Sequence, residues 1–351
     1  MRGMPESFFE SLGPEARELL LAAARPVSFV KGSTLVRHGD AARGAFVLRE
    51  GEAEARVPAP GGESVVVARF AGGDIFGEMA LVEAGTCTAT VVATAHVDGW
   101  FLAFEDFRAA VSQRHGAARE LQHAVTQVLA GRLRALNARL AALPSPEDRP
   151  ARAATAAAQP RAGVARAHRA SFDLAAYLPR LAFFERFPAE EIDELAAAAR
   201  ILEAERGSML HAPGGEADAV LIVVRGAVEV VRPVDGHERR VAILGPGKPL
   251  GFMGVLLRAP QGTHAWAREA STLLEIPAEA FRALYFGEAP SASRLRAAVQ
   301  RSLLESLGRT NRVLTRLATH ARLRAQMESA EQIEAAGAAQ LWAAPAPGQS
   351  R

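Results

Sequence analysis

The stretch FGEMALVEAGTCTAT, residues 76–90, combines three local signals. Gly77 allows a sharp turn, because glycine readily adopts backbone conformations that other residues avoid. The next four residues, which begin with Glu78, predict one short helical turn whose free N–H groups and dipole favour an anion. A loop of small residues follows, and it contains Cys87, the only cysteine of the chain. The pattern predicts a glycine turn, a short helix and a loop of small residues, and it raises the question of what this loop holds.

Glycines at matching positions indicate that the chain contains a duplicated domain. Three glycines recur 175 positions later and two recur 174 positions later: Gly32 with Gly207, Gly39 with Gly214, Gly51 with Gly226, Gly73 with Gly247, and Gly77 with Gly251. These glycines separate short apolar runs, which is typical of strands joined by turns in a sandwich or barrel. The spacing is too long for one unit of a solenoid.

A helical pattern begins each copy, at 8–24 and 181–200, and a long helix with a heptad spacing of apolar residues closes it. The two seams are Leu129, Leu133, Leu136, Leu140 and Leu143, and Leu303, Leu307, Thr310, Leu314 and Leu317. Gly131-Arg132 recurs as Gly308-Arg309, so the duplication includes the closing helices. The seams predict packing against the barrels, or a helix pair formed either within one chain or between two chains.

Composition changes mark the domain boundaries. Residues 144–172 are rich in Pro, Ala and Arg, and we expect a flexible linker there because the segment has too few large apolar residues to fold alone. The first domain then covers residues 1–143, the second covers 173–340, and 341–351 form a tail.

Bulk composition argues against several classes of protein. Hydrophobic residues make up 49% of the 351 positions, and 41 basic residues nearly balance 39 acidic ones, which is not the basic excess of a dedicated nucleic-acid binder. One cysteine cannot form a disulfide framework, and the sequence has no H-x-H metal pair and no arrangement of catalytic residues. We therefore expect no enzyme activity, no cofactor and no metal. The absence of a signal peptide and of a long apolar run predicts a cytoplasmic location, and the Ala/Arg-rich composition is typical of a bacterial chain.

The order of predicted elements and the block GGDIFGEMAL (72–81) resemble a known domain. It is the cyclic-nucleotide-binding domain of the catabolite activator protein family and of the regulatory subunit of cyclic-AMP-dependent kinase. The resemblance covers roughly residues 5–143 and 173–320. It implies a mainly β fold with flanking helices: two eight-stranded β-rolls of the jelly-roll-like, double-stranded β-helix type, each closed by a long helix.

The resemblance also implies a ligand cassette in the first copy. A glutamate at the position of Glu78 accepts hydrogen bonds from a ribose hydroxyl, and a later arginine grips the cyclic phosphate. Here that arginine is replaced by Cys87 or, with a shift of one residue, by Thr88. Arg37 and Arg69 are candidates to supply the missing charge. The residues implied for ligand binding are Gly77, Glu78, Met79, Ala80, Leu81, Cys87, Thr88, Ala89, Leu136 and Asn137.

The second copy departs further from the family pattern. Gly251 is kept, but Phe252 stands at the glutamate position and Gly262 or Thr263 at the arginine position. A phenyl ring cannot accept a hydrogen bond from ribose, so we expect this domain to be degenerate. For Cys87 we expect a small, partly buried residue, with a redox-sensing thiol or haem ligand as the alternative.

These observations predict a regulatory sensor module rather than an enzyme. The first domain would bind cyclic AMP, cyclic GMP or a related small anion weakly, with a substitute arginine, or would bind another ligand, and the closing helices would act on an unknown protein partner. The alternative is an interaction protein with two vestigial pockets, in which the tandem forms a pseudo-dimer within one chain. The segment after Leu317 reads as continued helix and tail, not as a helix-turn-helix, so we expect no DNA binding.

Overall fold

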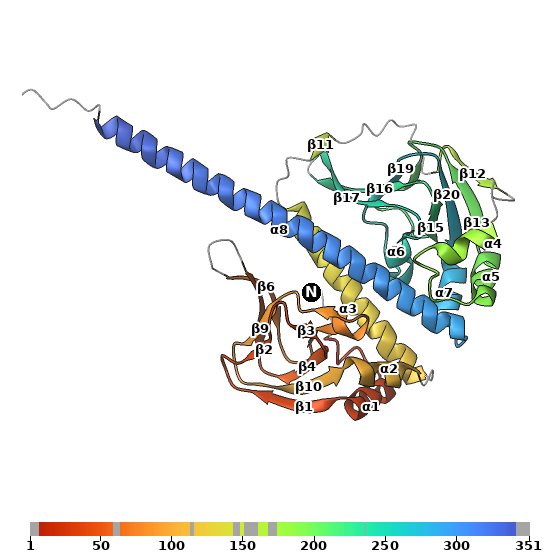
Figure 1. Ribbon diagram of the computed structural model, residues 1–351, viewed down its shortest axis with the longest axis horizontal. Helices are drawn as coiled ribbons and strands as arrows, with labels where there is room; N and C mark the ends of the chain where they lie inside the picture. Colours follow the sequence, from red (N-terminus) through yellow and green to blue (C-terminus); the bar gives the residue numbers. More distant parts are fainter. Residues whose placement is uncertain are drawn as a thin grey trace, which may run out of the picture.

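The computed structural model describes residues 7–58, 64–112, 116–142, 148–150, 161–167, 174–234 and 236–341. Two β-rolls lie on either side of a pair of long helices (Figure 1). The mainly β fold with flanking helices, predicted from the sequence, is confirmed.

Two four-stranded antiparallel sheets form the first roll, with orders β1-β10-β4-β7 and β2-β9-β5-β6, and β3 pairs with β8 beside them. The strands are β1 (Arg25–Phe29), β2 (Thr34–Val36), β3 (Ala41–Ala42), β4 (Gly44–Glu50), β5 (Ala53–Pro58), β6 (Ser64–Phe70), β7 (Ile75–Phe76), β8 (Gly85–Thr86), β9 (Thr90–Ala93) and β10 (Val97–Ala103). Gly51 turns the chain between β4 and β5 with φ of 94°, and a Cβ there would lie 2.0 Å from the His96 carbonyl oxygen. Only glycine fits this turn, which explains why it recurs as Gly226 with φ of 90°.

The second roll repeats both strand orders. Its strands are β13 (Arg200–Ala204), β14 (Met209–His211), β15 (Ala219–Arg225), β16 (Val228–Val234), β17 (His237–Leu244), β18 (Pro249–Leu250), β19 (His264–Ala267) and β20 (Ser271–Pro277). The order β13-β20-β15-β18 matches β1-β10-β4-β7, and β17-β16-β19-β14 is the counterpart of β6-β5-β9-β2 read in the same direction. Apolar runs such as AVLIVVR in β15 are buried along almost their whole length, because this strand lies in the middle of its sheet under the helices.

Two parts of the predicted flexible linker are strands instead. β11 (Arg149–Pro150) pairs with β17, and β12 (Val164–Ala167) pairs with β13, so the segment adds one strand to each sheet of the second roll. Asp148, just before β11, holds the buried Arg239 through two hydrogen bonds of 2.7 and 2.5 Å. A buried guanidinium needs such a partner. Backbone pairing fixes these two short strands, and the ion pair adds to the pairing of β11, neither of which the low apolar content of the segment predicts.

Helices flank each roll and cover its ends. They are α1 (Pro14–Ala23), α2 (Phe104–Ser112), α3 (Gly116–Ala141), α4 (Leu174–Tyr177), α5 (Ala189–Ala197), α6 (Phe252–Leu257), α7 (Ala278–Phe286) and α8 (Pro290–Leu341), with short 3₁₀ turns η1 (Glu78–Leu81) and η2 (Leu178–Arg180). The largest hydrophobic core joins α1, α3, α5, α7 and α8 to both rolls, while a separate core fills each roll.

The closing helices α3 and α8 pack along each other within one chain, and α8 continues past both rolls (Figure 1). Seven of the ten predicted seam positions are buried: Leu129, Leu133, Leu140, Leu303, Leu307, Thr310 and Leu317. Leu143 lies outside the described residues. A helix pair within one chain and packing against the rolls, two of the arrangements left open by the sequence, are both present in the structure.

A buried polar network crosses this helix pair. Tyr285 of α7 donates to Thr126 of α3 at 3.0 Å, and Arg296 of α8 donates to the Gln122 side chain at 2.7 Å. Gln300 donates to the Gln122 carbonyl oxygen at 3.0 Å. Because buried polar groups are costly when unpaired, these bonds fix how the two helices lie against each other.

Candidate functional site

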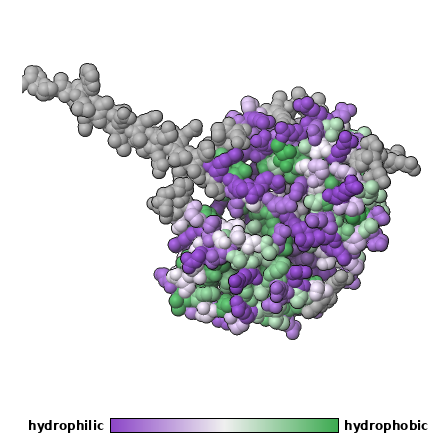
Figure 2. Space-filling view, viewed as in Figure 1, coloured by the Kyte–Doolittle hydropathy of each residue, from purple (hydrophilic) through white to green (hydrophobic). Residues whose placement is uncertain are grey.

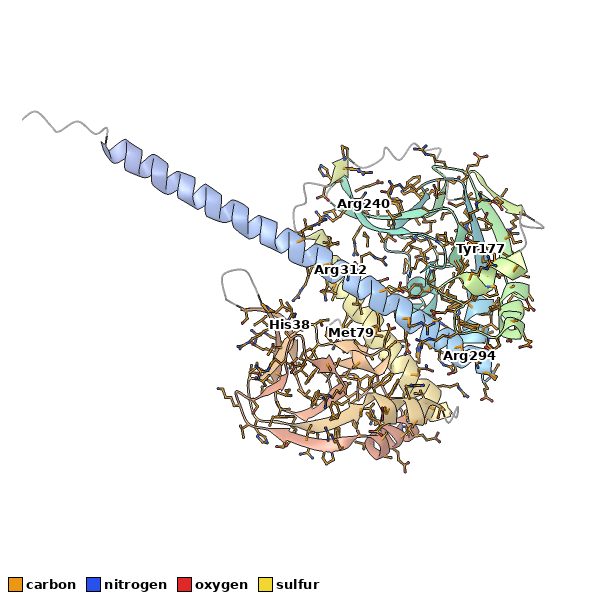
Figure 3. The ribbon with its side chains drawn as sticks, in the orientation of Figure 1. His38, Met79, Tyr177, Arg240, Arg294 and Arg312 are labelled. Carbon is orange, nitrogen blue, oxygen red and sulfur yellow. The ribbon has the colours of Figure 1, made fainter. Side chains whose placement is uncertain are left out.

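The first cassette has the predicted local geometry. β7 leads into Gly77, whose φ is 76°, and a Cβ there would lie 2.8 Å from the Gly44 carbonyl oxygen. η1 follows, with Ala80 and Leu81 buried, and Met79 lies beside α3 (Figure 3). This packing turns the Glu78 side chain inward, where it is 0% exposed.

Glu78 is held by an arginine that the sequence analysis did not single out. Arg132 of α3 forms a salt bridge with Glu78 Oε2 and donates a second hydrogen bond to the Ile75 carbonyl oxygen at 2.6 Å. The Arg132 guanidinium also lies 5.6 Å from the centre of the Phe70 ring. Glu78 Oε1 is buried and has no hydrogen-bond partner within the described part of the chain. The cassette thus contains one carboxylate oxygen that can still accept a hydrogen bond, and it lies beside the positively charged Arg132 of α3.

The two residues of this pair are 54 positions apart, so no local pattern joins them. The repeat carried the signal that could have found Arg132, because Gly131-Arg132 recurs as Gly308-Arg309 on the second closing helix. An arginine kept in both copies at a helix face that meets the cassette is a candidate for a shared role.

Cys87 is fixed by backbone hydrogen bonds at the edge of an open pocket. The Cys87 N–H donates to the Asp40 carbonyl oxygen at 2.8 Å, and the Cys87 carbonyl oxygen accepts from the Gly39 N–H at 2.9 Å. These two backbone hydrogen bonds hold the loop against residues 39–40, as in a pair of antiparallel strands. Its side chain lines an open pocket of about 440 Å³, together with Arg37, and Glu78 is not part of that lining. Burial, followed by the charge of Asp40, raises the pKa of the Cys87 thiol. A protonated thiol is a poor nucleophile and metal ligand, which argues against a redox role.

The remaining predicted residues take different positions. Thr88 is exposed, and half-buried Ala89 packs on the core of the first roll. Of the two arginines considered as substitutes, Arg69 is engaged by Glu54 at 2.6 Å. Arg37 is exposed at the Cys87 pocket.

The closing helix α3 presents different residues to the two domains. Arg132 and Arg139 reach the first roll, where Arg139 donates to the Val67 carbonyl oxygen at 2.6 Å. Leu136 packs against the large core. Asn137 faces the other way: it accepts a 3.4 Å hydrogen bond from Thr310 of α8 and lines a cavity of the second domain. The structure therefore does not bring Asn137 together with Glu78.

In the second cassette, Gly251 has φ of 81°, and α6 takes the place of η1. Phe252 is 6% exposed and belongs to the large core. The counterpart of Cys87 is Gln261, whose carbonyl accepts from Gly214 at 2.8 Å as the Cys87 carbonyl does from Gly39. Sequence analysis placed Gly262 or Thr263 at the arginine position, which is one residue too far along the chain. The offset between the repeats falls from 175 to 174 before the cassette, so Cys87 corresponds to Gln261.

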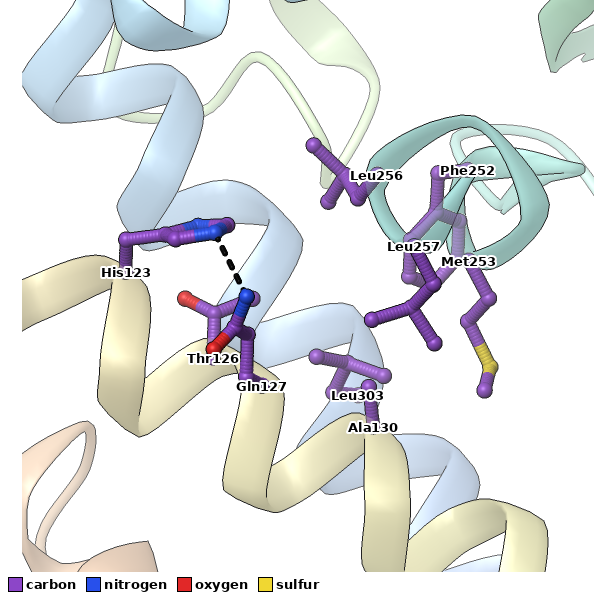
Figure 4. A pocket seen from close by; sticks show the side chains of 9 residues that line it. All are labelled: His123, Thr126, Gln127, Ala130, Phe252, Met253, Leu256, Leu257 and Leu303. Carbon is purple, nitrogen blue, oxygen red and sulfur yellow. Dashed lines mark hydrogen bonds between the residues drawn. The ribbon is translucent and has the colours of Figure 1, made fainter. Parts of the chain in front are cut away.

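A small apolar cavity lies where α3, α6 and α8 meet (Figure 4). Its volume is about 10 Å³, so it holds at most one water molecule. His123 stands at its edge and hydrogen bonds to Gln127 at 3.0 Å. Burial, followed by the charge of Arg296, lowers the pKa of His123. This cavity is a packing feature of the helix pair, not a ligand site.

Two further searches concern the described residues only. Within them, no group of three or more His, Cys, Asp or Glu side chains is placed to hold a metal ion. None of the helices there is both long and apolar enough to cross a membrane.

Comparison with known proteins finds one curated relative and many matching solved structures. The relative is a cAMP-dependent protein kinase regulatory subunit from Colletotrichum orbiculare, 33% identical over 88 residues, which are 25% of this chain and 22% of that protein. The regulatory domain of Toxoplasma gondii PKA with cAMP is 18% identical, with 85% of this chain and 91% of that chain covered and a TM-score of 0.31. Thermus thermophilus catabolite activator protein is 24% identical, with 38% and 67% covered and a TM-score of 0.34.

Family membership rests on the sequence pattern rather than on these two structures. The pattern of the cyclic nucleotide-binding domain matches residues 26–114 and 201–287, one match in each roll and together half of the chain. Both matches contain the glycine turns and the cassette described above. The chain belongs to the cyclic nucleotide-binding domain family and carries two copies of that domain.

Proposed function

We propose that the chain is a non-enzymatic regulatory module whose first domain senses a cyclic nucleotide or a related small anion. The observation that carries the proposal is the Glu78 carboxylate, which is fully buried, with Oε2 held by Arg132 and Oε1 without a partner among the described residues. A buried acceptor without a donor is costly, so it is kept most readily where a ligand supplies the donor. The ribose of a cyclic nucleotide offers such a hydroxyl group.

Arg132 supplies the charge that the cassette lacks at Cys87 and Thr88. The Arg132 side chain is 31% exposed, so an anionic group beside Glu78 can reach it. Because Arg132 belongs to α3, a ligand that competes for it acts directly on the helix that packs along α8. An unidentified protein partner would then recognise the altered position of the closing helices.

The test is calorimetric titration of the full chain with cyclic AMP and, separately, cyclic GMP. We expect a stoichiometry near one and, in Glu78→Gln, a loss of affinity of about tenfold or more, equivalent to 1.4 kcal/mol. Glu83→Gln is the matched control, because Glu83 is an exposed acid in the same cassette region. Equal affinity of Glu78→Gln and the unmutated chain would contradict the assignment of the site.

Cys87→Arg tests the missing phosphate contact in the same experiment. An arginine at this position restores a charge-assisted contact of the family pattern, and we expect at least about a tenfold gain in cyclic-nucleotide affinity. No gain would mean that the loop, fixed between Gly39 and Asp40, does not direct residue 87 to the phosphate.

The second candidate function is an interaction protein whose two pockets are vestigial. The buried network of Gln122, Thr126, Tyr285, Arg296 and Gln300 favours it, because these hydrogen bonds join the closing helices of the two domains within one chain. If the unmutated chain binds neither nucleotide in the titrations while Cys87→Arg does bind, the result would support this second function over the first. A cytoplasmic location, a bacterial origin and the absence of DNA binding remain predictions.

A further inference from the structure

A large cavity lies between the second roll and the two closing helices. Its volume is about 710 Å³, within the range of sites for small organic ligands. One wall is built from β16, β17, α6 and the loop that follows α6, and the other comes from α3 and α8. The first domain thus contributes a wall to a cavity of the second domain.

The charge at this cavity is opposite to that expected for a family cassette. Arg309 of α8, the counterpart of Arg132 in the repeat, lines the cavity, but Phe252 replaces the glutamate that would neutralise it. The hydrogen bond of Arg309 within the described chain goes to the Ser306 hydroxyl at 3.3 Å. The cassette has lost its anion and kept its cation.

Two more arginines face the cavity from the two domains. Arg232 comes from β16 and is half-buried, and Arg134 comes from α3. Burial, followed by the nearby charge of Arg134, lowers the pKa of Arg232, so the two guanidinium groups are close enough to repel each other. Neither guanidinium group forms a hydrogen bond or ion pair with another described residue, and no acidic side chain is among the described residues that line the cavity.

Neutral polar groups and an apolar surface complete the lining. His211 interacts with Thr263 across 3.5 Å, and burial lowers the pKa of His211 to about 4, so this side chain is uncharged at neutral pH. The apolar part of the lining includes Val230, Leu244, Leu250, Phe252, Met253 and Leu257. Three arginine side chains therefore lie beside an apolar surface, in a cavity whose volume suits a small organic molecule.

We propose that this interdomain cavity binds a small organic anion, whose phosphate or carboxylate group is held by Arg134, Arg232 and Arg309 and whose apolar body packs on α6. Like charges held close together cost stability, and a bound anion reduces that cost while it joins α3 to the second roll. Recognition does not pass through a ribose hydroxyl, because Phe252 offers no acceptor. The site is separate from Glu78 and does not depend on the function proposed for the first domain.

The first experiment measures thermal unfolding of the full chain in sodium phosphate and in sodium chloride at equal ionic strength. We expect phosphate to raise the Tm of the unmutated chain and of Arg225→Gln, a control that removes an exposed arginine outside the cavity. Arg134→Gln/Arg232→Gln should lose the phosphate effect and, in chloride, unfold at a higher temperature than the unmutated chain. An undiminished phosphate effect in the double variant would overturn the proposal.

The second experiment uses 8-anilinonaphthalene-1-sulfonate, an anion with an apolar aromatic body, as a fluorescent probe. We expect one site per chain, and binding at least about tenfold weaker in Arg134→Gln and in Arg232→Gln. Arg225→Gln and Glu78→Gln should bind the probe as the unmutated chain does. Absence of binding, or binding that does not depend on Arg134 and Arg232, contradicts the proposal, whereas a change in Glu78→Gln alone would place the probe in the first domain. Competition by adenosine 5′-monophosphate but not by octanoate would identify a phosphate ligand, and the reverse a carboxylate ligand.

Discussion

Glu78 is the residue on which interpretation of the first domain depends, and its surroundings give it two roles. Its Oε2 holds α3 in place through Arg132, while its buried Oε1 remains available to a ligand. Under the proposed function, a single carboxylate would both stabilise the ligand-free fold and respond to a ligand. This combination is possible because the partner arginine comes from the closing helix and not from the cassette.

The Glu78–Arg132 pair predicts unequal effects of its two single substitutions. Arg132→Gln leaves a fully buried carboxylate without a cation and should cost about 3–5 kcal/mol of unfolding free energy. Glu78→Gln should cost less, because Arg132 is 31% exposed and can turn to solvent. Urea unfolding of both variants and of the double variant measures the coupling between the two side chains. Additive losses would show that the two side chains do not interact.

His211 predicts a pH dependence of stability. Its pKa is lowered from 6.5 to about 4, mainly by burial, so the unfolded chain binds a proton more readily than the folded chain between these values. The free energy of unfolding should therefore fall as the pH falls from 6.5 towards 4, by up to about 3 kcal/mol from this group. His211→Gln should remove this part of the pH dependence, whereas substitution of the exposed His38 should not. Identical pH profiles for the two variants would contradict the assignment.

At the scale of elements, the repeated glycines and short apolar runs predicted a duplicated β domain, and the resemblance of the cassette block to a known domain implied the two rolls. Gly51 and Gly77 sit at turns where a Cβ would collide with backbone, so their recurrence reports local geometry directly. Arg132 could not be assigned to Glu78 from the sequence, because that contact depends on where α3 crosses the roll. The strands β11 and β12 were missed for a similar reason: their pairing partners, not their own composition, make them strands.

The polar network between α3 and α8 predicts a specific stability effect at the same scale. Gln122→Leu removes the acceptor of buried Arg296 Nε and should cost about 1–3 kcal/mol. Gln127→Leu is the matched control, since it makes the same change on the same helix at an exposed position. Chemical unfolding compares the two. Arg296 also donates to the Tyr285 carbonyl at the end of α7, where the helix dipole favours a cation, so the loss should remain partial.

At the scale of the whole molecule, α3 is the element that the two domains share. It carries Arg132 to the first cassette and Arg134 to the cavity of the second domain, two residues further along the helix. A rigid helix cannot shift at one of these positions and stay fixed at the other. The two rolls are therefore not independent domains. The strands β11 and β12, which lie between the rolls in the sequence, also pair with strands of the second roll.

This arrangement predicts that the two sites are thermodynamically coupled. Saturating cyclic AMP, added to whichever of the unmutated chain or Cys87→Arg binds it, should change the affinity for 8-anilinonaphthalene-1-sulfonate by about fivefold or more, the lower end of typical coupling. Linkage requires the probe to change the affinity for cyclic AMP by the same factor, so the two titrations check each other. Hydrogen exchange across residues 120–142 should change with either ligand, because α3 carries the effect. Equal probe affinity with and without cyclic AMP, together with unchanged hydrogen exchange in α3, would mean that this helix does not move and that the two domains bind their ligands independently.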